Sequence, residues 1–363
     1  MNAALLDQLD LVCPVCRGRC TAASAPHRIL LTEVYEQRGD FVIQGLLQCA
    51  GPDCAARFPI VDGVPIILRD LLRWWVDQRP HVVVQPRLAD GLVDLFSALD
   101  RRVMTHREDI QATRVYLDAH YGHPDPPASL PWLSGLQEDY WQSVTAMVAA
   151  TDSPTGISLD LGCSVGRLTV ELGRVSHLAV GIDIQFAAVQ RAAIMQRKGQ
   201  GTFHRQIGGG RLEPVKIAVD SPDNLLFLVA DALDPPFEAY FFDRVAALNQ
   251  LDNVAYPTVL LGQMDALLKT GGEMLLASPY EWRREITDPG EWLVDPTLTS
   301  ADVVRAILAN QWRGGPGLGL NYTIVDEIDE LPWVLRNHDR HWTVFLVHLL
   351  RSRKQALAGD DGR

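Results

Sequence analysis

The sequence predicts an α/β fold with a mainly parallel sheet, preceded by a small β-rich unit. From Ile157 onward, short apolar runs alternate with helical stretches, as in strands joined by crossover helices. Before that point, most of the cysteines and several β-branched runs gather near the N-terminus. A chain of 363 residues also has room for two domains and a connector. We expect the β-rich unit at residues 1–70, a helical connector at 71–152 and the α/β domain at 153–355.

The N-terminal unit carries short β-rich runs at Ile29–Tyr35, Phe41–Leu47, Phe58–Val61 and Val64–Leu68. Glycine-containing turns separate them, as at Arg38–Asp40, so we expect a hairpin. The following connector is predicted to be helical in Leu88–Arg102, Asp109–His120 and Leu136–Ala150. A proline-rich loop at residues 122–127 interrupts these helices, because proline cannot continue a helix.

The α/β domain has five candidate strands: Ile157–Leu161, Ala179–Ile182, Leu225–Val229, Arg244–Leu248 and Glu273–Ala277. Candidate helices follow at Arg167–Gly173, Phe186–Gln196 and Thr258–Leu268. A late pair of runs, Tyr322–Ile328 and Trp342–Leu349, is expected to close the sheet in the antiparallel sense.

The net charge and the distribution of apolar residues limit the classes of substrate and the location that we expect for the protein. The formal net charge is −12, which disfavours a nucleic-acid substrate, since phosphate contacts need a dense basic surface. No apolar run reaches the roughly 18 residues of a membrane span. Met1–Leu11 lacks a basic start followed by an apolar run. We therefore expect a cytoplasmic protein that acts on a small molecule or peptide, with no indication of its oligomeric state.

Five of the six cysteines lie in the first 54 residues, and this clustering favours a metal over disulfides. Two pairs, Cys13 with Cys16 and Cys49 with Cys54, each place two thiolates on a tight turn, so together they predict a tetrahedral Zn²⁺ site. Four thiolates fill the coordination sphere, and the metal is therefore expected to be structural. Cys20 and His27 are alternative ligands, and a set of reduced, buried cysteines is the plain alternative.

Residues 11–68 resemble the small zinc-ribbon family typified by the activator subunit of eukaryotic tRNA and protein methyltransferases. The likeness is carried by Cys13-Pro-Val-Cys16, the second cysteine pair and the run Phe58–Leu68. In that family the ribbon is an accessory part. The resemblance therefore implies a stabilising or substrate-presenting role here.

Carboxylates and glycines follow three of the candidate strands. The first strand runs into Asp160-x-Gly162-x-Ser164-x-Gly166, where glycines let the backbone approach a ligand and a helix N-terminus offers free N–H groups. Asp183 ends the second strand, about 20 residues later, at the spacing of a ribose-binding acid. Asp231 ends the third strand. The carboxyl ends of parallel strands meet at one sheet edge, so a ligand site is predicted there.

This ordered set resembles class I S-adenosylmethionine (SAM)-dependent methyltransferases over residues 157–350, which implies a Rossmann-like seven-stranded sheet and SAM as the cofactor. By that resemblance Asp160, Gly162 and Gly166 line the methionine side of the cofactor. Asp183 holds the ribose, and Asp231 with Ala232 flanks the adenine. The remaining predicted cofactor-binding residues are Cys163, Ser164, Arg167, Ile184 and Asn249.

Two other enzyme classes share parts of this pattern. Gly162–Gly166 also fits the G-x-S-x-G turn of α/β-hydrolases, with Asp295 and then His338 or His341 as later partners. That interpretation leaves Asp183, Asp231 and the cysteines unexplained. A nicotinamide dehydrogenase is disfavoured because the loop lacks the G-x-G-x-x-G spacing.

Residues that act on the methyl acceptor are expected after the fourth and fifth strands. Asn249 and Tyr280 are the catalytic candidates there, although a loop cap and a half-buried aromatic are the plain alternatives. Tyr121, next to His120 in the connector, is a third candidate as part of a lid, with simple packing as its alternative.

The segment from Asn249 through Ser278-Pro-Tyr280-Glu-Trp282 to Trp292 is similar to the mercaptohistidine N-methyltransferases of ovothiol biosynthesis and, more distantly, to carnosine N-methyltransferase. The resemblance implies an imidazole nitrogen as the acceptor, with Tyr280 and Trp292 walling an aromatic substrate. The sequence leaves two other functions open: an RNA methyltransferase that uses the ribbon for recognition, and a non-catalytic SAM-binding interaction module.

Overall fold

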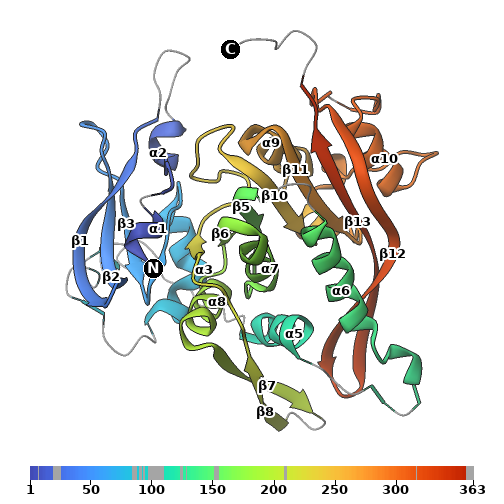
Figure 1. Cartoon of the computed structure of the whole chain (residues 1–363), viewed down its shortest axis with the longest axis horizontal. Helices are drawn as coiled ribbons and strands as arrows, with labels where there is room; N and C mark the ends of the chain where they lie inside the picture. Colours follow the sequence, from blue (N-terminus) through green and yellow to red (C-terminus); the bar gives the residue numbers. More distant parts are fainter. Residues whose placement is uncertain are drawn as a thin grey trace.

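A computed structural model of the chain shows a small blue β-sheet unit packed beside a larger α/β body (Figure 1). It describes residues 1–363 except 7, 19–25, 84–87, 90–91, 93–94, 97–109, 123–125, 128, 151–154, 208–210, 316 and 357–363. Most of the expected helix at residues 88–102 lies outside the described residues, as does Cys20.

The N-terminal unit is an antiparallel sheet in the order β1-β2-β3-β4. Its strands are β1 (Ile29–Arg38), β2 (Phe41–Cys49), β3 (Arg57–Val61) and β4 (Val64–Pro65), preceded by the short helices α1 (Ala3–Leu6) and α2 (Pro14–Arg17). Arg38 pairs with Phe41 across the first turn. The predicted hairpin is therefore present, and both strands run slightly beyond the predicted ends.

The α/β body is built on a seven-stranded sheet in the order β12-β13-β11-β10-β5-β6-β9. The strands from β11 to β9 run parallel, and β13 and β12 close the sheet in the antiparallel sense. The strands are β5 (Thr155–Leu161), β6 (Ser176–Asp183), β9 (Leu225–Val229), β10 (Phe242–Leu248), β11 (Leu268–Ser278), β12 (Tyr322–His338) and β13 (His341–Lys354). The predicted α/β fold with its late antiparallel pair is confirmed.

The chain order of the strands reverses at β5. From β5 the chain moves outward to β6 and β9, and it then returns to place β10 on the other side of β5. The crossover helices include α7 (Arg167–Val175), α8 (Phe186–Lys198) and α9 (Pro257–Leu267). Ligands of open parallel sheets bind at the carboxyl ends of strands where the order reverses. The ends of β5, β6 and β10 are therefore where a site is expected.

Three connector helices lie against this body: α3 (Leu71–Val83), α5 (Ile110–Tyr121) and α6 (Leu136–Ala149). The hairpin of β7 (Gln200–Ile207) and β8 (Arg211–Ala218) was not predicted, because β7 is mostly polar and half-exposed and gives no period-2 apolar signal. Helix α10 (Ser300–Leu308) was also missed, although Thr299 and Asp302 form a capping box that marks its start.

The N-terminal unit joins the large sheet along its β9 edge. Ile66 forms a parallel bridge with Val229, and the N–H of Ile67 donates to the carbonyl of Val229 at 2.6 Å. Nearby, the carboxylate of Asp234 pairs with Arg17 and Arg69, both at 2.6 Å. Buried apolar residues of the two units belong to one continuous cluster. The two units therefore pack as neighbours across a shared core.

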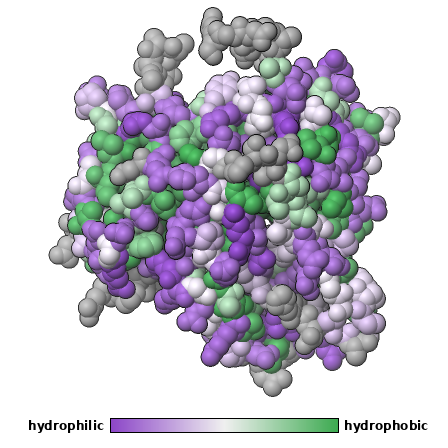
Figure 2. Space-filling model, viewed as in Figure 1, coloured by the Kyte–Doolittle hydropathy of each residue, from purple (hydrophilic) through white to green (hydrophobic). Residues whose placement is uncertain are grey.

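Hydrophilic and hydrophobic residues are interspersed over the face of the molecule shown in Figure 2. No helix in the described part of the chain is both long enough and apolar enough to cross a membrane.

A buried ion network fixes the order of β10, β11 and β13. The guanidinium of Arg244, only 1% exposed, donates to Glu273 at 2.6 Å and to the carbonyl of Val148 at 2.9 Å. Arg351 and Arg353 donate to the other oxygen of Glu273 at 2.9 and 3.2 Å. Burial opposes ionisation of Glu273, but these arginines outweigh it and hold the pKa of Glu273 below its ordinary value.

We predict that Glu273→Gln destabilises the protein by about 3 kcal/mol, because it leaves the buried guanidinium of Arg244 without a charged partner. Urea denaturation at pH 7 measures this, with Glu238→Gln at an exposed position as the control. The folded-state pKa of Glu273 lies below its ordinary value, so its stabilisation is present above that ordinary value and is lost as the pH falls through the folded-state pKa. A stability difference that does not shrink in acid contradicts this account of the network.

Candidate functional site

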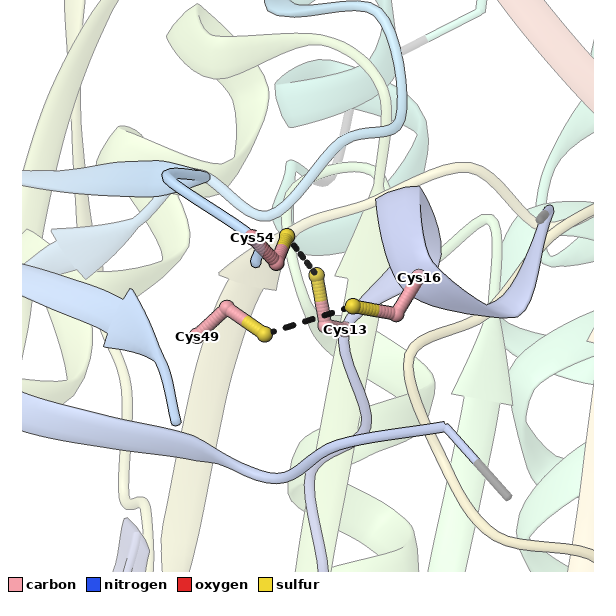
Figure 3. Close-up of side chains that lie close together, drawn as sticks. All are labelled: Cys13, Cys16, Cys49 and Cys54. Carbon is pink, nitrogen blue, oxygen red and sulfur yellow. Dashed lines mark hydrogen bonds between the residues drawn. The ribbon is translucent and has the colours of Figure 1, made fainter. Parts of the chain in front are cut away.

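Four cysteine thiols meet where the N-terminal helix α2 faces the end of β2 (Figure 3). The Sγ atoms of Cys13, Cys16, Cys49 and Cys54 all lie within 4.8 Å of one another. The Sγ atoms of Cys13 and Cys54 are 3.9 Å apart, and those of Cys16 and Cys49 are 3.4 Å apart. Zinc with four thiolates at 2.3 Å requires sulfur–sulfur distances of about 3.8 Å. The cluster therefore has the size of a tetrahedral zinc site.

Burial raises the pKa of Cys13, Cys16 and Cys49 to about 11. Without a metal these thiols stay protonated at neutral pH, so a bound metal has to displace their protons. His27, an alternative ligand from the sequence, is not among the clustered residues.

The loop that follows β5 is shaped by backbone conformations that favour glycine. Gly162 and Gly166 have φ values of 79° and 83°, and Ser164 between them has φ 48°. A Cβ atom on Gly162 would lie 2.2 Å from Oε1 of Gln250, which itself belongs to the loop after β10. Glycine at position 162 is thus required both by its positive φ and by the close approach of the loop after β10, the neighbouring strand in the sheet.

Two carboxylates stand beside this loop, that of Asp160 buried and that of Asp183 half-buried. Asp160 accepts a hydrogen bond from the hydroxyl of Thr169 at 2.7 Å. Asp183, at the end of β6, accepts from the N–H of Ser164 at 2.9 Å and from the N–H of Gln185 at 2.8 Å. Burial raises the pKa of Asp183. Burial also raises the pKa of Asp160 to about 7, and the charge of Asp183 adds to that shift against the hydrogen bond from Thr169.

A cavity of about 380 Å³ opens at the ends of β5, β6 and β10. Its lining includes backbone and carboxylates of the strand ends: Asp160, Gly162, Cys163, Ser164, Asp183 and Ile184. Its lining also includes five aromatic rings from α5, α6 and β12: Tyr116, His120, Tyr140, Trp141 and Trp333. The cavity thus combines a polar half with an aromatic half.

The five aromatic residues form a closed circuit, which we call the five-ring wall. Neighbouring ring centroids lie between 5.0 and 6.4 Å apart around the circuit. Tyr116 lies nearly parallel to Trp333, at 22°, whereas Tyr140 meets Trp141 at 87°. Contacts of this kind fix the rings against one another and leave flat faces toward a ligand.

Asn249 connects the two halves of the cavity. It follows β10 with φ 52°, an uncommon left-handed conformation that asparagine tolerates better than most residues. Its amide Nδ2 donates to the hydroxyl of Tyr140 at 3.2 Å, which ties it to the five-ring wall. The structure therefore brings together Asp160, Asp183 and Asn249, three of the residues that the sequence singled out.

Other predicted cofactor residues lie elsewhere. Asp231 is exposed and accepts from the N–H of Leu233 at 2.8 Å, and neither it nor Ala232 lines the cavity. Gly166 is the N-cap of α7 and does not line it either. Arg167 lines a second cavity, of about 530 Å³, that meets the first at His120 and Trp141.

The two tyrosines proposed as catalytic are outside the main cavity. Tyr121 lines the second cavity and donates to the carbonyl of Val165 at 3.2 Å. The hydroxyl of Tyr280 lies 2.7 Å from Nδ1 of His348, and Tyr280 does not line the cavity. Trp292 donates to the carbonyl of Thr287 and does not line the cavity.

Tyr116 and Trp333 were missed by the sequence analysis. Tyr140 and Trp141 adjoin each other on a predicted helix, which is a visible signal. Trp333 comes from a late strand almost 200 residues away, and no local pattern connects it with that helix. Only the antiparallel return of β12 along the sheet brings it to the site.

The hydrolase alternative lacks its partners. Ser164 lines the cavity, but Asp295, His338 and His341 do not. His338 and His341 instead contact each other, with ring centroids 5.5 Å apart, at the turn between β12 and β13.

Residues 134–314 match a family of proteins described as a methyltransferase domain. The match spans α6 and the strands β5 to β11, and so includes Asp160, Asp183 and Asn249. The chain therefore carries a methyltransferase domain.

Solved structures resemble the chain only distantly. The N-methyltransferase NodS from Bradyrhizobium japonicum WM9 is 14% identical, with 61% of this chain and 96% of that chain covered and a TM-score of 0.39. A putative S-adenosylmethionine dependent methyltransferase from Listeria monocytogenes is 16% identical, covering 60% and 99%, with a TM-score of 0.39. A chain from the complex between the Haloferax volcanii Trm112 methyltransferase activator and the putative methyltransferase is 16% identical, covering 69% and 100%, with a TM-score of 0.41. We draw nothing further from likenesses of this size.

The cysteine cluster predicts about one zinc ion per chain in purified protein, as measured by elemental mass spectrometry. Cys13→Ser removes a ligand and should lower the zinc content to near zero. Cys163→Ser, at a cysteine outside the cluster, is the matched control and should retain the metal. Zinc that is absent from the unaltered protein, or unaffected by Cys13→Ser, contradicts the assignment.

Proposed function

We propose that the protein transfers the methyl group of SAM to a nitrogen atom of a small-molecule or peptide acceptor, with an imidazole nitrogen as the leading case. One observation carries the proposal: a single cavity is lined both by two carboxylates and a glycine loop at the strand ends and by the five-ring wall. That arrangement separates a site for a charged nucleoside cofactor from a site for an acceptor.

The polar half fits the charges of SAM. SAM carries a positive sulfonium and a positive amino group. Positive charge bound beside Asp160 and Asp183 favours the ionised forms of both carboxyls, whose pKa values burial raises. In this proposal Asp160 and the loop at Gly162 and Cys163 hold the methionine part, and Asp183 with Ile184 holds the ribose.

Five further residues complete the proposed cofactor site; Ser164 lines the main cavity, and the other four lie outside it. Ser164 supplies the N–H that fixes Asp183, and Gly166 begins α7. Asp231 and Ala232 flank the adenine, which requires the cofactor to extend along the end of β9. Arg167 supports the loop from behind.

The aromatic half fits an acceptor. Bound SAM supplies a methyl group on a good leaving group, so the residues of this chain have to align the acceptor and exclude water. Asn249 is placed between the two halves and is the leading acceptor-binding residue. Tyr121 and Tyr280 have supporting roles in this proposal, because each lies behind residues that are nearer the cavity.

The similarity of residues 249–292 to mercaptohistidine N-methyltransferases supports an imidazole acceptor, and the aromatic lining agrees with a flat substrate. A net charge of −12 disfavours RNA. We also propose that the N-terminal unit holds a structural zinc ion and stabilises the catalytic domain, and that the protein works in the cytoplasm.

The proposal predicts that the purified enzyme binds S-adenosylhomocysteine, the product form of the cofactor, in calorimetric titration. Asp183→Ala should weaken this binding at least tenfold, equivalent to about 1.4 kcal/mol. The substitution removes both the ribose partner and the acceptor that orders the N–H of Ser164.

Asp223→Ala, at an exposed position before β9, is the control and should leave the affinity unchanged. Equal affinity of Asp183→Ala and the unaltered protein would show that the ribose assignment is wrong. If the unaltered protein does not bind S-adenosylhomocysteine, the proposed function is wrong.

A further inference from the structure

Three buried polar atoms of the candidate site have no hydrogen-bond partner within the described residues. They are Nε1 of Trp333, Nδ1 of His120 and Oδ1 of Asn249. Each belongs to a residue that lines the 380 Å³ cavity. Buried polar atoms in folded proteins are nearly always paired, and an unmade bond costs about 1–3 kcal/mol. Three such atoms around one cavity are best explained by a ligand that supplies the missing partners.

A guanidinium, that of Arg167, lies near the five-ring wall and pairs with Glu171 at 3.1 Å. The guanidinium of Arg167 lies behind the wall, 5.4 Å from the ring centroid of Trp141 and 5.6 Å from that of Tyr121. Arg283 lines the cavity beside Asn253. Burial, and after it the charge of Arg167, lowers the pKa of His120 to about 3, so its imidazole is neutral at physiological pH.

The carboxylates that line the cavity, Asp160 and Asp183, belong to the strand ends of the proposed cofactor site and not to the elements that carry the five rings. A cationic acceptor beside the five-ring wall would therefore meet the positive charge of Arg167, which already disfavours protonation of His120. A neutral acceptor avoids this repulsion and keeps its nitrogen lone pair free for methylation.

We infer that the five-ring wall and Asn249 select an uncharged, flat azole that carries a hydrogen-bond-accepting substituent, and this inference rests on the proposed function. The ring N–H donates to Oδ1 of Asn249, which turns the other ring nitrogen toward the methyl group. The N–H of Trp333 and the imidazole of His120 bind the substituent.

The transfer then balances without another reagent. The lone pair of the free ring nitrogen forms the bond to the methyl carbon while the methyl–sulfur bond breaks, and its electron pair stays on sulfur. The positive charge moves to the ring, which then releases the N–H proton to water. The products are a neutral N-methyl azole and S-adenosylhomocysteine.

Calorimetric titration of the enzyme saturated with S-adenosylhomocysteine tests this inference at pH 8.5, where imidazole rings are uncharged. The probes are imidazole-4-carboxamide, which has the substituent, imidazole, which lacks it, and 1,3-dimethylimidazolium, which is permanently charged. We expect the carboxamide to bind more tightly than imidazole, and the cation to bind at least tenfold more weakly than imidazole.

Two variants separate the contacts. Trp333→Phe removes the indole N–H and keeps an aromatic ring, and it should weaken the carboxamide about five- to tenfold while leaving imidazole nearly unchanged. Asn249→Leu should weaken both neutral probes. Trp312→Phe is the matched control, because its Nε1 is also buried without a partner in the described part of the chain, but Trp312 does not line the cavity.

Each outcome has a distinct meaning. If S-adenosylhomocysteine does not bind, the proposed function fails. If it binds but the azoles do not, only the acceptor class is wrong. If 1,3-dimethylimidazolium binds as tightly as imidazole, the five rings act as a cation site and the inference is wrong. If Trp333→Phe and Trp312→Phe have equal effects on binding of the carboxamide, Trp333 does not bind the substituent.

Discussion

The carboxylate of Asp183 is the contact on which the candidate site depends. One of its oxygens accepts from the N–H of Ser164 and the other from the N–H of Gln185, so a single side chain joins the loop after β5 to the loop after β6. Ser164 sits at φ 48°, a conformation that costs a residue other than glycine about 1–2 kcal/mol. The hydrogen bond that the N–H of Ser164 donates to Asp183 offsets that cost, and the shape of the polar half of the cavity follows from it.

The N-terminal unit supports the same region from outside. The segment after β4 extends the sheet at β9 through Ile67, and the helix that follows places the indole of Trp74 against the loop after β6. Nε1 of Trp74 donates to the carbonyl of Ile184 at 2.7 Å, directly after Asp183. Next to the cysteine cluster, Arg17 pairs with Asp234 of the α/β body. The region of the cysteines is thereby linked through packed elements to the loop after β6.

Local signals made the polar half of the site predictable, because Asp160, Gly162 and Asp183 each follow an apolar run that ends a strand, and strand ends meet in a parallel sheet. The cysteine pairs were equally clear. The five-ring wall was not predictable, because its rings come from α5, α6 and β12 and meet only through the tertiary fold. For the same reason the sequence placed Tyr280 near an acceptor, whereas its side chain turns toward His348.

A crystal structure of the protein with S-adenosylhomocysteine tests most directly the claim that one cavity holds both cofactor and acceptor. The account predicts the ribose hydroxyls on Asp183, the amino group near Asp160 and the sulfur atom facing the five-ring wall beside Asn249. A nucleoside bound outside this cavity, or bound with its sulfur turned away from Trp141 and Trp333, contradicts it.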